Sequence, residues 1–283
     1  MMGPLVETDW VADHLGDDNL RILDGSWYLP AMGRNATEEF ASSHIPGARY
    51  FDIDAISEPD SPLPHTLPSP AYFADQVGAL GVSHTDRIVV YDGAGLFSAA
   101  RVWWMFRTMG AKNVAVLNGG FKAWQAEGRQ TESALPEIVA STFEAVLDRD
   151  WVCDITTIRS ATQTGSHEIA DARPGDRFTG EVPEPRAGLR SGHMPSSSST
   201  PIGTFIDGDG KIKAPDGLAA AFSEAGIDID RPILTTCGSG VTAAIPYLAL
   251  HLLGRFDVKL YDGSWTEWGG HPDTEVLQGP AGG

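Results

Sequence analysis

The stretch Ile233-Leu234-Thr235-Thr236-Cys237-Gly238-Ser239-Gly240-Val241-Thr242-Ala243-Ala244 decides the fold. Its first four residues are apolar or β-branched and predict a short buried strand. A loop with two glycines follows, and we expect a helix to begin at Val241. A strand, a glycine loop and a helix in this order are typical of an α/β protein with a parallel sheet.

Cys237 stands at the head of this loop. A loop between a buried strand and a helix N-terminus directs backbone N–H groups and partial positive charge to one spot, which favours an anion. Gly238 and Gly240 allow the turn and remove Cβ atoms that would keep a ligand from the amides. A cysteine sulfur held there is expected to be a nucleophile at neutral pH. The alternative is a buried cysteine that acts as a small hydrophobic residue, and the loop alone leaves both open.

The elements around Cys237 recur in the first half of the chain. In this register Asp92 occupies the position of Cys237, so the nucleophile belongs to the second copy alone. The matching pairs are Leu20–Asp24 with Glu168–Asp171, His44–Pro46 with His193–Pro195, Ile88–Gly110 with Ile233–Gly254, and Val114–Phe121 with Val258–Trp265. Two copies of one strand-and-helix unit predict a tandem α/β protein, each domain a mostly parallel sheet flanked by helices.

We therefore expect a catalytically inactive first domain at residues 1–130, a linker at residues 131–147 and a catalytic domain at residues 148–283. The linker assignment rests on the stretch from Gly128 to Val139, which has no hydrophobic period and contains a proline. A duplicated scaffold without any chemistry is the non-enzyme alternative.

Three other chemistries use a similar loop. Cysteine phosphatases need an arginine six residues after the cysteine to grip the phosphoryl group, and that position is Ala243. A P-loop needs a lysine that the loop lacks. Gly238 to Ala243 fits a relaxed dinucleotide fingerprint, with Asp262 as a ribose partner. The match is short, and the twin loop that begins at Asp92 breaks it, so we give it little weight.

The composition limits the partners and the compartment. The 283 residues suit two domains, and 38 acidic against 20 basic residues give a net charge of −18, which should repel nucleic acid and anionic membranes. Cys153 and Cys237 have no metal-like or Cys-x-x-Cys spacing, so neither a disulfide framework nor a zinc site is predicted. Met1 to Trp10 lacks the pattern of a signal peptide, and no apolar run of about 18 residues occurs. We expect a cytoplasmic protein without membrane contact.

With the repeat and the loop established, the chain resembles the tandem-domain rhodanese superfamily, and within it the 3-mercaptopyruvate sulfurtransferases. The resemblance covers nearly the whole chain, and the motifs are specific only in combination. They are Cys237 to Thr242, Asp171-Ala172-Arg173, Arg177-Phe178-x-Gly180, Glu184-Pro185-Arg186, Gly192-His193-Met194-Pro195 and Asp262-Gly263-Ser264-Trp265-x-Glu267-Trp268.

The resemblance implies that Cys237 attacks the sulfur of 3-mercaptopyruvate, becomes a persulfide and releases pyruvate. A thiol or cyanide then takes the outer sulfur, and a thioredoxin-like dithiol is the implied protein acceptor. Arg177 and Arg186 match the substrate-binding arginines, since a guanidinium can hold a carboxylate by two parallel hydrogen bonds; two surface arginines in a loop are the alternative. The implied loop contacts to the donor are Gly238, Gly240, Val241 and Thr242. No metal or organic cofactor is implied.

The resemblance also implies a triad of Asp54, His65 and Ser239, in which the histidine moves a proton during sulfur transfer. The alternative is that His65 is a solvated residue of the proline-rich stretch at residues 57–70. Two other enzyme or binding functions stay open. One is a thiosulfate:cyanide sulfurtransferase, although such enzymes carry cations after the cysteine where this loop has Gly238 and Ser239. The other is a sulfur-carrier or binding module without turnover.

Two features depart from or lie outside the family pattern. Ser196 to Thr200 follows Pro195 where the family, like the first copy at Gly47, has a glycine turn into a short strand, which leaves the path of this segment open. Cys153 lies far from the loop in sequence, and we expect it to be structural.

Overall fold

The computed structural model describes residues 2–281, and the chain divides into two compact units. Unit 1 comprises the residues up to Asp60, Leu67–Asp148 and Gly208–Ile212. Unit 2 comprises Ser61–Thr66, Arg149–Asp207 and the residues from Lys213 onward. Each unit therefore contains one short segment that lies, in sequence, within the other half of the chain.

Unit 1 is a five-stranded sheet in the order β1-β5-β4-β2-β3, and all its strand pairs are parallel. The inner strands β4 and β5 are almost entirely apolar and buried, as expected where helices cover both faces of a sheet. The strands are β1 (Leu5–Val6), β2 (Leu20–Asp24), β3 (Arg49–Tyr50), β4 (Arg87–Tyr91) and β5 (Val114–Leu117). The helices are α1 (Thr8–Asp13), η1 (Pro30–Met32), α2 (Ala36–Ser42), α3 (Pro70–Ala79), α4 (Ala99–Thr108) and α5 (Gly120–Ala126).

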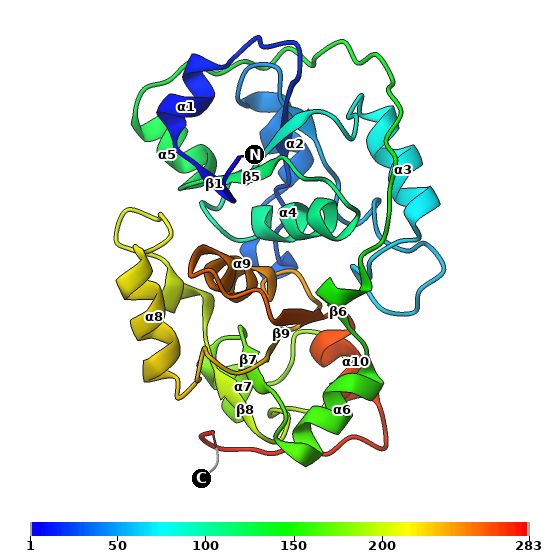
Figure 1. Cartoon of the computed structure of the whole chain (residues 1–283), viewed down its shortest axis with the longest axis vertical. Helices are drawn as coiled ribbons and strands as arrows, with labels where there is room; N and C mark the ends of the chain where they lie inside the picture. Colours follow the sequence, from blue (N-terminus) through cyan, green and yellow to red (C-terminus); the bar gives the residue numbers. More distant parts are fainter. Residues whose placement is uncertain (1, 282–283) are drawn as a thin grey trace. The chain divides into compact units, whose positions relative to one another are not determined.

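The interior of unit 1 contains two groups of packed side chains. On one face, side chains of β2, β4 and β5 pack with residues of α1, α2 and α5, including Val11, Phe40 and Trp124. Elsewhere in the unit, Phe106 of α4 makes edge contacts with Phe73 of α3 and with Phe143, with ring centroids 5.1 and 5.7 Å apart. In Figure 1, α1 and α5 lie together, apart from α3 and α4.

Unit 2 repeats this architecture with strand order β6-β10-β9-β7-β8, again all parallel. Its strands and α-helices follow one another along the chain in the same order as those of unit 1. The strands are β6 (Val152–Cys153), β7 (Glu168–Asp171), β8 (Ser197–Ser199), β9 (Ile233–Thr236) and β10 (Val258–Tyr261). The helices are η2 (Arg149–Trp151), α6 (Ile155–Thr164), α7 (Gly175–Thr179), η3 (Ile202–Phe205), α8 (Pro215–Glu224), α9 (Ala244–Leu252) and α10 (Ser264–Gly270).

The core of unit 2 places α6 and α10 on one face of the sheet, where Ile158, Trp265 and Trp268 pack with Ile169 and Leu234. Figure 1 shows α6 and α10 near each other and α8 away from them. β9 lies in the middle of the sheet, between β10 and β7. The loop at its carboxyl end is therefore where an α/β fold places its reactive groups.

The sheets confirm the predicted fold class of two α/β domains with parallel sheets. The prediction that a helix begins at Val241 is wrong, because α9 begins at Ala244. Gly240 has a φ of 81°, which a helix cannot continue, and a turn follows in which Ala244 and Ile245 donate to the carbonyls three residues earlier. Because of this turn, the regular helix begins three residues later than predicted.

The segment from Ser196 to Thr200, whose path the sequence left open, contains the short strand β8. β8 pairs with β7 in parallel, with Ser197 opposite Ile169 and Ser199 opposite Asp171. Ser196 has a φ of 60°, close to the 74° of Gly47 at the matching position of unit 1. Ser196 therefore adopts the left-handed conformation that glycine adopts in unit 1, and this conformation costs a non-glycine residue ~1–2 kcal/mol.

Among residues 2–281, no helix is long and apolar enough to cross a membrane.

Candidate functional site

Cys237 is the first residue after β9 and is 2% exposed. The turn between β10 and α10 fixes its backbone: its N–H donates to Ser264 Oγ at 3.2 Å, and its carbonyl accepts from the N–H of Trp265 at 2.9 Å. The next carbonyl, of Gly238, accepts from both the N–H and the hydroxyl of Thr266. The start of the loop is therefore held rigidly by a neighbouring element, which sequence reasoning did not foresee.

The twin loop in unit 1 shows what such a loop binds. Asp92, at the position of Cys237, is fully buried. Its carboxylate accepts hydrogen bonds of 2.8–2.9 Å from five backbone N–H groups, those of Ala94, Gly95, Phe97, Ser98 and Ala99. The loop is thus a cradle for an anion, and in unit 1 the chain supplies that anion itself.

The two loops have the same length, since α4 begins seven residues after Asp92 and α9 begins seven residues after Cys237. Their second glycines, Gly95 and Gly240, both have positive φ values, of 114° and 81°. A sulfur anion on Cys237 would occupy the place of the Asp92 carboxylate, where oriented amides stabilise negative charge. This supports the reactive interpretation of Cys237 over that of a small hydrophobic residue.

Arg177 lies beside this loop. A Cβ atom added to Gly238 would lie 3.1 Å from Arg177 Nη2. The guanidinium of Arg177 also pairs with Glu184, with Nη2 2.5 Å from Oε2 and Nε 3.2 Å from Oε1. The Glu184 side chain is 1% exposed, so its position is fixed. It holds Arg177 next to the loop, and the glycine leaves room for the guanidinium.

Arg173 also pairs with the carboxylate of Glu184. It was not identified as a site residue from the sequence. It is fully buried, and it donates to Asp171 through Nε and Nη2, to Glu184 through Nη1 and to the carbonyl of Gly192. Its guanidinium lies 4.0 Å from the ring centroid of Trp265. The only sequence signal was the Asp-x-Arg pattern after a buried strand. Arg173 thus connects β7, α10 and the Glu184–Arg177 pair.

His65 belongs to unit 2, through the short segment Ser61–Thr66. Its Nδ1 lies 2.9 Å from Ser239 Oγ, in a hydrogen bond whose donor depends on the tautomer. Each of the two residues is 5% exposed, which contradicts the alternative of a solvated loop residue for His65. The backbone of His65 has a φ of 62°, an uncommon conformation for a non-glycine residue that is often found at functional sites.

The other predicted residues are placed as follows. Asp54 lies in unit 1, in a turn after β3, and its carboxylate accepts from Trp27 Nε1 at 3.1 Å. Arg186 is partly buried in the segment between α7 and β8. Val241 and Thr242 lie in the turn before α9. The triad with Asp54 and the substrate contacts of these residues stay predictions.

Cys153 has different surroundings from Cys237. It ends β6, is 2% exposed, and belongs to the core that contains Trp265. Burial raises the pKa of its thiol to about 12, helped by the nearby Asp154. A thiol that stays protonated at neutral pH is a poor nucleophile, so the chemistry of this residue agrees with the predicted structural role.

Known proteins resemble the chain over almost its full length. A 3-mercaptopyruvate sulfurtransferase from Escherichia coli strain K12 is 43% identical over 272 residues, which cover 96% of each chain. A thiosulfate sulfurtransferase from Cricetulus griseus is 42% identical over 287 residues, which cover 98% of this chain and 96% of the relative. Relatives at this level of identity thus include enzymes named for each of two sulfur donors, 3-mercaptopyruvate and thiosulfate.

The crystal structure of a 3-mercaptopyruvate sulfotransferase from Escherichia coli matches with a TM-score of 0.86 and 40% sequence identity, covering 94% of this chain and all of that chain. The rhodanese-like domain matches twice, at residues 7–127 and at residues 155–271. Both matches agree with the repeat and the strand order described above. The chain belongs to the rhodanese-like domain family, with two copies of the domain.

Proposed function

We propose that the chain is a sulfurtransferase that takes the sulfur of 3-mercaptopyruvate onto Cys237 and passes it to a thiol or cyanide. The observation that carries the proposal is the cradle: Cys237 stands where its twin loop holds the Asp92 carboxylate with five backbone N–H groups. The 3-mercaptopyruvate relatives from Escherichia coli named above support the same activity, which the family resemblance also implies.

In the first half-reaction, the thiolate of Cys237 attacks the sulfur of 3-mercaptopyruvate. An S–S bond forms and the C–S bond breaks, with its electron pair going to carbon to give the enolate of pyruvate. The enolate takes a proton and leaves as pyruvate. In the second half-reaction, an acceptor thiolate attacks the outer sulfur of the persulfide, and the S–S bond breaks to return Cys237 as a thiolate.

The surrounding side chains have separate tasks in this scheme. The amides of the Cys237 loop stabilise the negative charge of the thiolate and of the persulfide. Arg177, held by Glu184 beside Gly238, binds the carboxylate of the donor, and Arg186 assists it. The His65–Ser239 pair carries the proton from the donor thiol toward the enolate. Asp54 is proposed to orient His65.

A thiosulfate:cyanide activity is the second candidate, and the 42% identity to a thiosulfate sulfurtransferase favours keeping it. The loop argues for the first candidate. Ser239 and the glycines carry no charge, and Arg177 shares its charge with Glu184, so the dianionic thiosulfate is held less well here than in a loop with cations at the positions of Gly238 and Ser239. A thioredoxin-like dithiol is the proposed acceptor, and a cytoplasmic location stays a prediction.

Steady-state kinetics with each donor separate the two candidates. We expect kcat/KM with 3-mercaptopyruvate to exceed that with thiosulfate by at least roughly tenfold, which corresponds to ~1.4 kcal/mol of discrimination. Cys237→Ser should be inactive with both donors, whereas Cys153→Ser should keep its activity. Higher kcat/KM with thiosulfate would make the second candidate the function. A wild type inactive with both donors would favour the carrier or binding module.

A further inference from the structure

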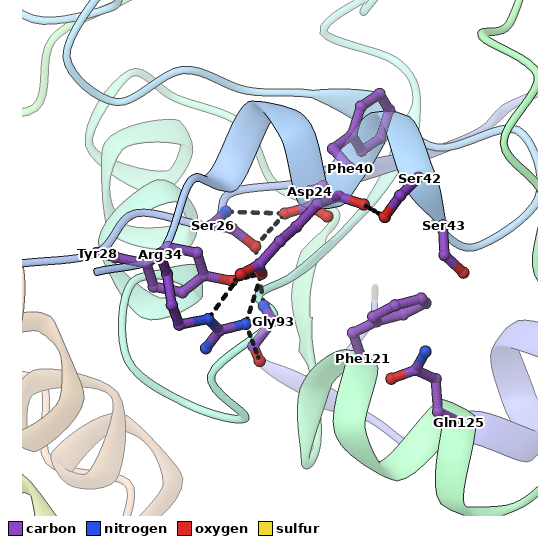
Figure 2. A pocket seen from close by; sticks show the side chains of 11 residues that line it. Asp24, Ser26, Tyr28, Arg34, Phe40, Ser42, Ser43, Gly93, Phe121 and Gln125 are labelled. Carbon is purple, nitrogen blue, oxygen red and sulfur yellow. Dashed lines mark hydrogen bonds and ion pairs between the residues drawn. The ribbon is translucent and has the colours of Figure 1, made fainter. Parts of the chain in front are cut away.

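Unit 1 has a pocket of about 180 Å³ that the sulfur-transfer scheme does not use (Figure 2). It lies at the carboxyl end of β2, next to α2 and α5. Its volume is below the ~300–1,000 Å³ of pockets for drug-sized ligands, so only a small molecule fits. The residues that matter for its chemistry are Asp24, Ser26, Arg34, Glu39, Ser43 and Phe121.

The pocket is lined by two carboxylates, Glu39 and Asp24, but by one guanidinium, that of Arg34. Arg34 and Glu39 neutralise each other through a two-pronged ion pair, with Nε 2.8 Å from Oε1 and Nη2 2.5 Å from Oε2. Figure 2 shows Arg34 next to Tyr28 at one side of the pocket. Asp24 is 4% exposed, and neutral groups bind it: the backbone N–H and hydroxyl of Ser26 donate to its Oδ1, and the hydroxyl of Tyr91 is also hydrogen-bonded to the carboxylate. Burial, the largest cause, raises the pKa of Asp24 to about 6, as expected for a carboxylate that lacks a cation.

In the second copy of the domain, an arginine side chain lies next to the aspartate that matches Asp24. Asp171 ends β7 as Asp24 ends β2, and two residues later unit 2 has Arg173 where unit 1 has Ser26. The guanidinium of Arg173 pairs with Asp171, lies over the ring of Trp265 and donates to the carbonyl of Gly192.

The wall residues of the pocket occupy the matching positions in unit 1. Phe121 stands at the position of Trp265 in the repeat, and Ser43 precedes His44 as Gly192 precedes His193. Both Phe121 and Ser43 line the pocket. The pocket is therefore the space that an arginine side chain fills in unit 2 and that the shorter Ser26 leaves open in unit 1.

We propose that this pocket binds a small molecule with a guanidinium or amidinium group, which pairs with Asp24 and stacks on Phe121 as Arg173 does with Asp171 and Trp265. A planar cation satisfies both the carboxylate and the aromatic face. An anion is disfavoured, because Glu39 already occupies the guanidinium of Arg34 and Asp24 would repel it.

The test is an NMR titration of the full-length, ¹⁵N-labelled protein with methylguanidinium chloride. The control probes are methylurea, which has the same planar shape without charge, and tetramethylammonium chloride, which has the charge without planar donors. We expect saturable shifts of the amides around Ser26, Gly93 and Phe121 with methylguanidinium alone. Shifts that do not saturate, or equal shifts with either control probe, would overturn the proposal.

Two variants make the assignment specific. Asp24→Asn should weaken methylguanidinium binding by roughly tenfold or more, because it removes the charged acceptor. Ser26→Arg should abolish binding by placing the chain's own guanidinium in the pocket, and wild-type amide shifts in the rest of unit 1, seen in the same NMR spectra, are its check of folding. Equal affinity of wild type and Asp24→Asn would refute the site, and Asp24→Asn decides the matter if Ser26→Arg does not fold.

Discussion

Ser239→Ala is the substitution that most sharply tests the roles assigned to the Cys237 loop. It removes the Oγ atom that lies 2.9 Å from His65 Nδ1, and both residues are 5% exposed. Water is therefore a poor substitute for the lost partner. A buried polar group left without its hydrogen bond costs ~1–3 kcal/mol. If the pair moves a proton in the transition state, this cost appears in the rate of sulfur loading as a ~5- to 150-fold decrease.

The assay is a single-turnover measurement of pyruvate release from 3-mercaptopyruvate, with the protein in excess over the donor. The second half-reaction, from preformed persulfide to an acceptor thiol, is measured separately and should change little. Ser160→Ala, an exposed serine of α6, is the matched control and should keep the wild-type rate. An equal decrease in both half-reactions would indicate a general disturbance of the loop.

A double-mutant cycle with His65→Ala decides whether the two residues act together. If they form one proton path, the double variant is no slower than the slower single variant, because the path is broken once. Wild-type loading rates in both single variants would remove the His65–Ser239 pair from the mechanism. Effects that simply add would show that the residues act independently.

Four further predictions concern the surroundings of the site and the two units. Arg186→Ala should raise KM for 3-mercaptopyruvate with little change in denaturant midpoint, and an unchanged KM would place the carboxylate site elsewhere. Glu184→Gln should lower the stability of unit 2 by ~3–5 kcal/mol in urea unfolding, because two arginines lose one buried carboxylate; an unchanged midpoint would contradict the network. Asp24→Asn should stabilise unit 1 by at most ~3 kcal/mol above pH 6, and the gain should vanish toward pH 4; a pH-independent change would refute this. Ser196→Gly should add ~1 kcal/mol of stability by relieving the left-handed turn, and a loss would show that the serine side chain is needed there.

The sign of the Asp24 prediction follows from linkage. Its pKa rises from 3.8 to about 6 on folding, chiefly through burial, with a smaller contribution from Asp92. The folded state therefore binds the proton more tightly than the unfolded state. The ionised carboxylate costs stability above pH 6, and protonation relieves that cost as the pH falls below this value.

The sequence was sufficient to predict the parts of the fold that depend on local pattern. β9 covers Ile233–Thr236, the four residues that the sequence predicts as a short buried strand, because they are an apolar or β-branched run that ends at a glycine loop. The repeat identified the Cys237 loop and its twin, because the order of elements survives even where side chains differ. The family and the fold class are confirmed by the comparisons.

The remaining features depend on contacts between distant residues. His65 meets Ser239 across 174 positions of sequence, in a proline-rich segment that has no periodic pattern. Ser196 adopts a conformation that propensity alone would assign to glycine, so the sequence could not define the path of β8. The role of Arg173 appears only when Glu184, Gly192 and Trp265 come together around it.

Intact-protein mass spectrometry after incubation with 3-mercaptopyruvate tests the central claim most directly. We expect the wild type and Cys153→Ser to gain the mass of one sulfur atom, and to lose it again when an acceptor thiol is added. Cys237→Ser should gain nothing, because it lacks the sulfur that forms the persulfide. No added sulfur on the wild type, or equal added sulfur on Cys237→Ser, would contradict the account.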